Sequence, residues 1–367
     1  MRQAMRAAMR AGALALTVVA ISGGAQLAHA GDFEEALKIA SDPALFATRA
    51  ADAERLFRSA AGDASKAKEA NFNLGLLLFR KGDVGGARAA WQKSLAADPK
   101  YLPARARLAG LELKDPSKAE SAAATLEAII VEDRFQADAR NLLAEYEMGR
   151  KNWDAAIKHE RNVLLGDPEN ITAFLNVAIA YFRQGLVDQA GLIAQSALEK
   201  HPDAAPLLNL MGLVYLHNDQ SRLAADSFLA ALKADPMLDD ARLNLAAMEL
   251  AYGNFDSAFK RFDEAFKAHP DNVQIAVSRG VALRGLGRFD EAEKSYLAAL
   301  ANSAGNVDIF YNLCVLHHQY TQKWDQAKQR CEELLAKIDK THPKYGEVAK
   351  RVKAIDATIR ALQPKTP

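Results

Sequence analysis

The sequence predicts an all-α chain of repeated helix–turn–helix units that stack into an α-solenoid. The clearest unit spans residues 205–238, where two helical patterns flank a polar turn. Leu208, Met211 and Tyr215 fall on one face of the first helix, and Pro236 ends the second because proline lacks a backbone N–H. One pair of helices cannot cover an apolar face this wide, so the unit needs neighbours of its own kind.

The same pattern recurs along most of the chain with a period of 34 residues. Small residues keep this spacing, with one step of 35, at Gly75, Ala109, Ala144, Ala178, Gly212, Ala246, Gly280 and Cys314. A second series is Ala87, Ala156, Ala190, Ala224, Ala258, Ala292 and, after one inserted residue, Ala327. Helix-ending prolines recur at Pro99, Pro168, Pro202, Pro236 and Pro270. The repetition indicates about eight stacked units.

The pattern resembles the tetratricopeptide repeat. In the fifth unit, the residues that carry the resemblance are Leu208, Met211, Gly212, Tyr215, Ala224, Phe228 and Pro236. It covers residues 68–341, in units at about 68–101, 102–135, 137–170, 171–204, 205–238, 239–272, 273–306 and 307–341. The fit is poorest in the second unit, where Ser121 and Thr125 stand in place of an alanine and an aromatic residue. The resemblance implies a right-handed α-solenoid.

The first thirty residues have the features of a cleaved secretory signal peptide. Residues 1–10 contain three arginines and no acidic residue, and residues 11–21 are apolar. Ala28 and Ala30 provide the small residues that a signal peptidase requires. We expect cleavage after Ala30 and a soluble mature chain in the periplasm. The alternative is an uncleaved anchor, but the apolar run is much shorter than the ~20 residues that span a bilayer.

Two flanking segments are expected to be helical. In residues 31–67, apolar residues such as Phe33 and Phe57 predict two helices, which are either capping helices or a degenerate further repeat. In residues 342–367, one helix after Pro343 has a narrow apolar stripe. We expect it to cap the array. The alternative is a helix that pairs with a second copy of itself.

Composition and motifs argue against several functional classes. The chain has 47 basic and 46 acidic residues, so charge provides no argument for nucleic-acid binding. It has no glycine-rich phosphate loop, His-Glu-x-x-His, Cys-x-x-Cys or nucleophile elbow. Only about 26 residues follow the last repeat. We therefore expect no enzyme activity, no cofactor and no metal, and protein partners instead.

The resemblance implies that ligands lie in a concave groove lined by the first helix of each unit. The apolar residues assigned to this groove are Phe72, Leu76, Phe79, Leu175, Ile179, Phe182, Leu213 and Leu216. Basic residues along its edge are Arg80, Lys114, Arg183 and His217. The lysine and asparagine of the family's carboxylate clamp are absent, so we do not expect one. The alternative is that these side chains only complete the packing between neighbouring first helices.

Cys314 and Cys331 are the two cysteines of the chain, and both lie in the last repeat. In the family's packing their positions face one another. In an exported protein this favours a disulfide. The alternatives are two buried free thiols or a metal site that includes His317 or His318.

The functional hypothesis is a periplasmic scaffold that assembles or tethers a cell-envelope complex, such as motility, pilus or secretion, or exopolysaccharide machinery. This hypothesis rests on analogy at the level of the fold. One alternative is a chaperone or carrier that holds apolar segments of exported proteins. Another is the regulatory subunit of an enzyme.

Overall fold

The computed structural model describes residues 30–363, and every regular element within them is helical. The prediction of a signal peptide falls on residues outside this range, apart from Ala30, the first residue of α2. None of the described helices is both long and apolar enough to cross a bilayer. The all-α prediction is therefore confirmed for the part of the chain that the structure describes.

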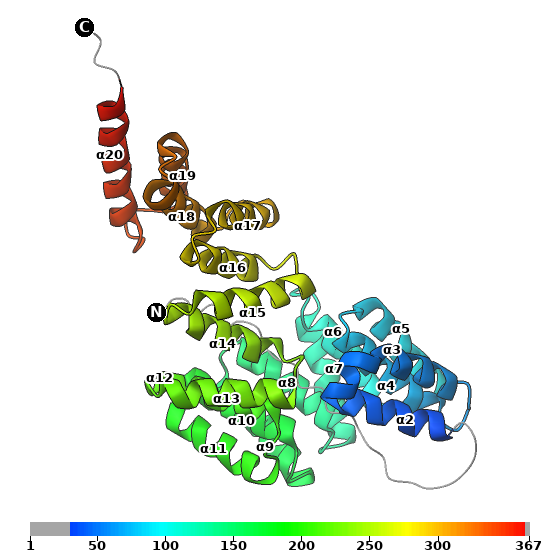
Figure 1. Ribbon diagram of the computed structural model, residues 1–367. Coiled ribbons are helices and arrows are strands. Elements are labelled where there is room, and N and C mark those ends of the chain that lie inside the picture. The colour runs from blue at the N-terminus through cyan, green and yellow to red at the C-terminus, as the bar shows by residue number, and fades with distance from the viewer. Residues whose placement is uncertain (1–29, 364–367) are drawn as a thin grey trace. The chain divides into compact units, whose positions relative to one another are not determined.

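The helices follow one another as antiparallel pairs (Figure 1). Their bounds are α2 Ala30–Ser41, α3 Pro43–Ala60, α4 Ala67–Arg80, α5 Val84–Ala97, α6 Leu102–Glu112, α7 Ala119–Glu132, α8 Ala137–Gly149, α9 Trp153–Gly166, α10 Ile171–Gln184, α11 Val187–Lys200, α12 Ala205–His217, α13 Ser221–Ala234, α14 Asp239–Ala251, α15 Phe255–Ala268, α16 Val273–Gly285, α17 Phe289–Asn302, α18 Val307–Val315, η1 Leu316–Thr321, α19 Trp324–Lys337 and α20 Tyr345–Leu362. This arrangement is the stack of helix–turn–helix units that the sequence predicts.

The described residues form two compact units, residues 30–241 and residues 242–363, with the boundary inside α14. Within the first unit, α6, α8, α10 and α12 lie side by side in sequence order, and α2 lies beside α4. Within the second unit, α16 lies beside α18 in the same way. Each unit therefore presents a surface made of consecutive first helices.

In three helix pairs the first helix has a glycine where a large ring of the second helix packs against it. The ring occupies the space that a side chain at the glycine would need. A Cβ atom on these glycines would lie only 2.3–2.4 Å from an atom of the ring. The pairs are Gly75 with Trp91, Gly212 with Phe228, and Gly280 with Tyr296. All three rings are buried. The recurring small residues therefore mark the places where the two helices of a pair approach most closely.

The last helix pair uses a disulfide at the equivalent place. Cys314 continues the series of small residues, and Cys331 stands at the place that Trp91, Phe228 and Tyr296 occupy in the three pairs described above. Their sulfur atoms are bonded at 1.98 Å, and their Cα atoms are 5.0 Å apart. A bonded pair is incompatible with the alternatives of free thiols and thiolate metal ligands.

The insertion in the last repeat takes the form of a π-helical segment. The first helix of this repeat changes from α18 to the π-helix η1, and Gln322 follows with a left-handed φ of 53°. A π-helix absorbs one extra residue without breaking the helix. The segment therefore keeps Ala327 in register on α19, where it is buried.

The second repeat differs from the sequence prediction by one residue. Ser121 and Thr125 are exposed, whereas Ala122 and Leu126 are buried in the core. The turn between α6 and α7 has six residues, against two or three in the other pairs with uninterrupted α-helices from α4 to α17. Pro116 lies in this turn and cannot continue α6. The assignment of Ser121 and Thr125 to the inner positions is therefore wrong, because the longer turn moves α7 by one position.

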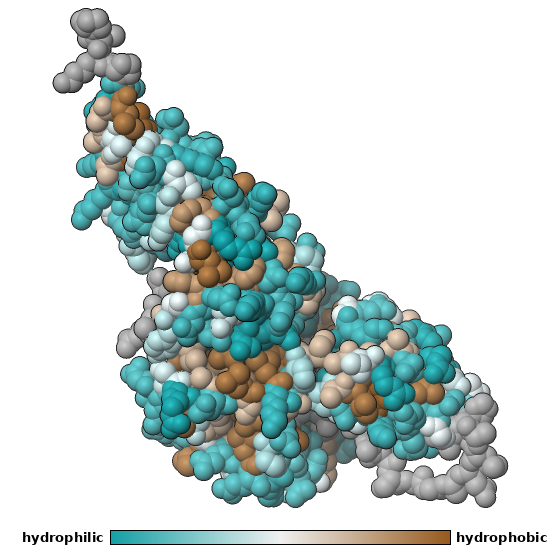
Figure 2. All heavy atoms as spheres, viewed as in Figure 1, coloured by the Kyte–Doolittle hydropathy of each residue, from teal (hydrophilic) through white to brown (hydrophobic). Residues whose placement is uncertain are grey.

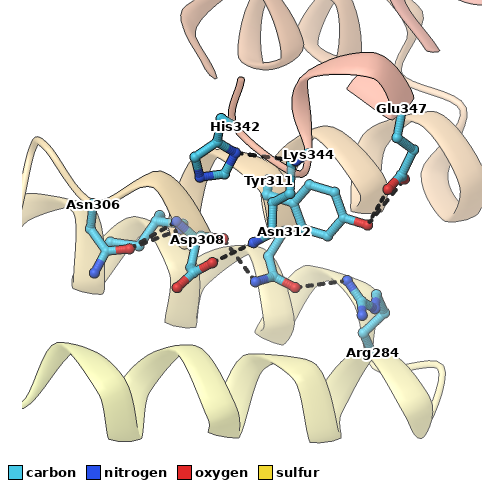
Figure 3. A network of polar contacts seen from close by, with 9 residues as sticks. Arg284, Asn306, Asp308, Tyr311, Asn312, His342, Lys344 and Glu347 are labelled. Carbon is cyan, nitrogen blue, oxygen red and sulfur yellow. Dashed lines mark hydrogen bonds and ion pairs between the residues drawn. The ribbon is translucent and has the colours of Figure 1, made fainter. Parts of the chain in front are cut away.

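The terminal helix α20 packs its apolar stripe against the preceding pair, where Val348 and Ile355 are buried. Polar contacts fix its first turn (Figure 3). The Tyr311 hydroxyl donates to Glu347 at 3.0 Å, and Lys344 pairs with Asp308. The apolar stripe that suggested pairing between two copies is thus covered by α18 and α19 of the same chain.

Candidate functional site

Three residues assigned to the groove are buried and belong to the core instead. The exposed fractions of Phe72, Leu76 and Leu175 are 0%, 4% and 2%. The ring of Phe72 packs edge-on against Tyr101, with 5.5 Å between the ring centroids. Consecutive first helices lie side by side, so these side chains fill the space between them. For these three residues the packing interpretation is right, and their assignment to the groove is wrong.

The other apolar groove residues lie at the surface. Phe79 on α4, Ile179 and Phe182 on α10, and Leu213 and Leu216 on α12 are half-buried. The edge residues Arg183 and His217 are exposed, and the His217 ring lies 6.3 Å from that of Phe182. We call the surface formed by these half-buried side chains the groove. It belongs to the first unit alone.

Arg80 is engaged in contacts within the chain. Its Nη1 donates to the carbonyl oxygen of Ala40 at 3.2 Å, and its guanidinium lies 3.8 Å from the centroid of the Phe46 ring. Its Nη2 lies 3.7 Å from Asp235, at the end of α13. Burial lowers the pKa of Arg80 from its ordinary value. Arg80 therefore ties α2, α3 and α13 to α4 and is not a free cation at the edge of the groove.

A cavity of about 300 Å³ opens among α4, α5, α6 and α8, and we call it the α6 pocket. Its lining residues are Phe79, Trp91, Arg107, Gly110, Leu111, Leu113, Lys114, Leu142, Glu145, Tyr146, Gly149 and Arg150. It lies in the groove, because it contains Phe79 and the ends of consecutive first helices. A mostly apolar cavity with a few polar groups is typical of a binding site.

The pocket exists because α6 ends early. The helix stops at Glu112, so Leu113 and Lys114 lie in the turn, and Gly110 leaves its wall without a side chain. A Cβ at Gly110 would lie 2.8 Å from Leu142 on α8, so glycine also allows the close approach of these two helices. The sequence contained the cause, a short helix before Asp115 and Pro116. Of the residues that line the pocket, however, the family resemblance placed only Phe79 and Lys114 at the groove or its edge.

The charged groups of the α6 pocket are only partly paired. Arg107 is almost fully buried, and its Nη2 forms an ion pair with Asp138, whereas its Nε has no acceptor among the described residues. The Nζ of Lys114 lies 5.8 Å from the centroid of the Phe79 ring. Arg150 donates to the hydroxyl of Tyr146 at 2.9 Å. Within residues 30–363, neither Lys114 nor Arg150 forms an ion pair with a carboxylate, so both cations remain available to a ligand.

A second, more open cavity of about 610 Å³ lies between α5, α6 and α7. Its charged side chains are paired within the chain, and Arg105 pairs with Glu132 outside the lining. Glu112 accepts from Arg88 at 2.7 Å and pairs with Lys118 at 2.9 Å. Because these charges are already neutralised within the chain, this cavity is less suited than the α6 pocket to bind a charged ligand.

The face of the molecule shown in Figure 2 is mainly hydrophilic. On the face shown in Figure 2, apolar residues gather in separate patches among hydrophilic ones. No group of three or more His, Cys, Asp or Glu side chains in residues 30–363 is arranged to hold a metal ion. The α6 pocket and the adjoining groove are therefore the candidate site.

Comparison with protein families agrees with this architecture. Models described as tetratricopeptide repeat match residues 42–101, 172–204 and 249–307. The chain is a tetratricopeptide-repeat protein. The solved structure of the Cut9–Hcn1 hetero-tetramer of the APC/C is similar in fold, with a TM-score of 0.63 and 14% sequence identity, over 89% of this chain and 67% of the other. Tetratricopeptide repeats mediate protein–protein interactions, so proteins are the expected partners of this chain.

Two curated relatives are similar to this chain over part of their length. The peroxisomal targeting signal receptor of Eremothecium gossypii is 28% identical over 55% of this chain and 36% of its own length. Cellulose synthase 1 operon protein C of Komagataeibacter xylinus is 26% identical over 69% of this chain and 20% of its own length. The chain thus spans about a third or less of the length of these relatives.

Proposed function

We propose that this tetratricopeptide-repeat protein is a periplasmic scaffold that assembles or tethers a cell-envelope complex through the groove of its first unit. The observation that carries the proposal is the combination of half-buried apolar side chains and the α6 pocket on consecutive first helices. Phe79, Phe182 and Leu213 leave apolar surface in contact with water, and a bound segment of another protein would cover it.

Two features support export to the periplasm. Residues 1–30 have the composition of a secretory signal peptide. The Cys314–Cys331 disulfide supports an oxidising compartment, because cytosolic thiols are normally kept reduced. The similarity to a protein of a cellulose synthase operon favours exopolysaccharide machinery among the envelope complexes considered.

The test is affinity purification of the tagged chain from crosslinked cells, with mass spectrometry of the captured proteins and of the chain itself. We expect a small, reproducible set of envelope proteins and a mature chain that begins at Gly31. Recovery of an uncleaved chain from the cytoplasmic fraction would contradict the periplasmic part of the proposal. A reproducible partner set without envelope proteins would contradict the rest.

The second candidate is a periplasmic chaperone or carrier for apolar segments of exported proteins. It is favoured by the mainly apolar lining of the groove, which recognises little beyond hydrophobicity at Ile179, Leu213 and Leu216. The same purification separates the two functions. A long and variable list of newly exported proteins would identify a chaperone.

A further inference from the structure

The α6 pocket combines an apolar space with cations that lack carboxylate partners. Phe79, Trp91, Tyr146 and three leucines form most of its lining, and its volume of about 300 Å³ lies at the lower end for ligand sites. A single bulky side chain of a partner protein fits such a space. The apolar lining alone, however, would accept many different side chains.

Charged groups distinguish this pocket from a purely apolar one. Lys114 and Arg150 lie against the rings of Phe79 and Tyr146, with the cationic groups 5.8 and 5.3 Å from the ring centroids. These contacts hold the cations beside the apolar space without neutralising them. The buried Arg107 supplies a third positive group, although Asp138 balances its charge. Glu145, an exposed carboxylate, lies on the same lining.

We propose that the α6 pocket binds one bulky apolar side chain of a partner segment, and that Lys114 and Arg150 hold an acidic side chain next to it in the sequence. This inference rests on the proposed function and defines the class of segment that the groove recognises. The acidic group is assigned to the interior of a segment because half-buried apolar residues continue beyond the pocket on α10 and α12. A segment that passes through the pocket therefore finds further apolar surface along the groove.

Gly149 provides a way to block the pocket without disturbing the fold. It is the last residue of α8, it lines the pocket, and a Cβ atom there meets no other atom within 4 Å. Gly149→Phe should therefore fill the pocket and leave the helix intact. Gly346→Phe is the matched control, because Gly346 lies in the first turn of α20, outside the pocket, and has equally open space around its Cβ.

The charge requirement has its own variant and control. Lys114→Gln with Arg150→Gln removes both unpaired cations and keeps side chains that form hydrogen bonds. The control is Lys350→Gln with Lys353→Gln, two exposed lysines of α20. Tyr146→Ala is a second pocket variant, which removes one wall and adds no atoms, in case Gly149→Phe lowers the melting temperature.

The experiment is selection of random ten-residue peptides by display on the purified chain, followed by affinity measurement on synthetic peptides. We expect enriched peptides with a bulky apolar residue beside Asp or Glu. Gly149→Phe should weaken their binding by about tenfold or more. The double glutamine variant should weaken it by about threefold and reduce its dependence on salt. Neither control should change the affinity.

Other outcomes overturn the inference. Enrichment of peptides without an acidic residue, affinities insensitive to Gly149→Phe and Tyr146→Ala, or no enrichment at all would each exclude this recognition. Peptides that bind as free acids but not as C-terminal amides would assign the carboxylate to a chain terminus instead. If the crosslinked envelope partners are still captured by Gly149→Phe, the inference about the pocket fails while the proposed function stands.

Discussion

The helix pairs α8/α9 and α12/α13 share one architecture but differ where their second helix enters the core. In α12/α13 this position holds Phe228, whose ring fills the space beside Gly212. In α8/α9 the equivalent residue, also 16 positions after the small residue, is Glu160. It is 1% exposed. The same position in the repeat thus holds a buried apolar ring in one pair and a buried ionisable group in the other.

The surroundings of Glu160 show how the chain tolerates this residue. Its Oε1 accepts a hydrogen bond from Asn176 on α10 at 2.6 Å, and its Oε2 has no partner among the described residues. Burial raises the pKa of Glu160 to about 8, so the carboxyl is largely protonated at neutral pH. A repeat can therefore accept a polar residue in its core, provided that the residue is neutral and at least partly hydrogen-bonded.

The largest expected effect is the loss of the apolar ring. Phe228→Ala should lower the free energy of unfolding of the first unit by about 3–5 kcal/mol, because it leaves a cavity beside Gly212. Glu160→Ala, the substitution at the equivalent position of the other pair, should lower the free energy of unfolding clearly less. Urea denaturation followed by circular dichroism measures both. Equal losses would mean that the two positions contribute equally and that the comparison is wrong.

Loss of the disulfide in the last helix pair, which stands in place of the ring-to-glycine contact, should have the next largest effect on stability. Reduction of the Cys314–Cys331 disulfide, which joins residues 17 positions apart, should destabilise the second unit by about 3 kcal/mol in the chain-entropy model. Thermal melting with and without a reducing agent tests this expectation, and Cys314→Ser with Cys331→Ser is the control that should no longer respond. A wild-type melting curve unchanged by complete reduction would contradict it.

The corrected register of α7 predicts a smaller difference between two neighbouring positions. Ala122→Leu should cost roughly 1–3 kcal/mol because Ala122 is buried and the added atoms overpack its surroundings. Ser121→Leu should change stability by less than about 0.5 kcal/mol because Ser121 is exposed. Chemical denaturation of both variants provides the measurement. A larger loss at Ser121 would restore the register that the sequence suggested.

The smallest expected effect is the pH dependence caused by Glu160. Its pKa is raised in the folded state, so the stability from its protonated form is complete below about pH 4.5 and is lost as pH rises towards 8. Glu160→Gln keeps an acceptor for Asn176 but cannot ionise. Relative to this variant, the wild type should lose on the order of 1 kcal/mol between about pH 7 and pH 8. Parallel melting curves across this range would show that Glu160 does not titrate there.

Much of the fold could be predicted from the sequence, because each repeat is defined by local spacing. The small residues at Gly75, Gly212 and Gly280 mark the helix contacts whichever units lie next to them. The positions of Cys314 and Cys331 in the last repeat likewise pointed to the bond between them. Less of the candidate site could be predicted, because the exposure of a side chain depends on the neighbouring units.

The sequence by itself thus determined the all-α repeat architecture, its period and the positions at which the helices of a pair meet. Only the tertiary structure decided which first-helix residues stay at the surface: Phe72 is buried between neighbouring helices, whereas Phe79, seven residues later, lines a pocket. It also brought Arg80 next to Asp235, which lies near the end of the first unit in the sequence. The physical reason is that periodicity reports contacts within one repeat, whereas burial and charge pairing are set by how successive repeats stack.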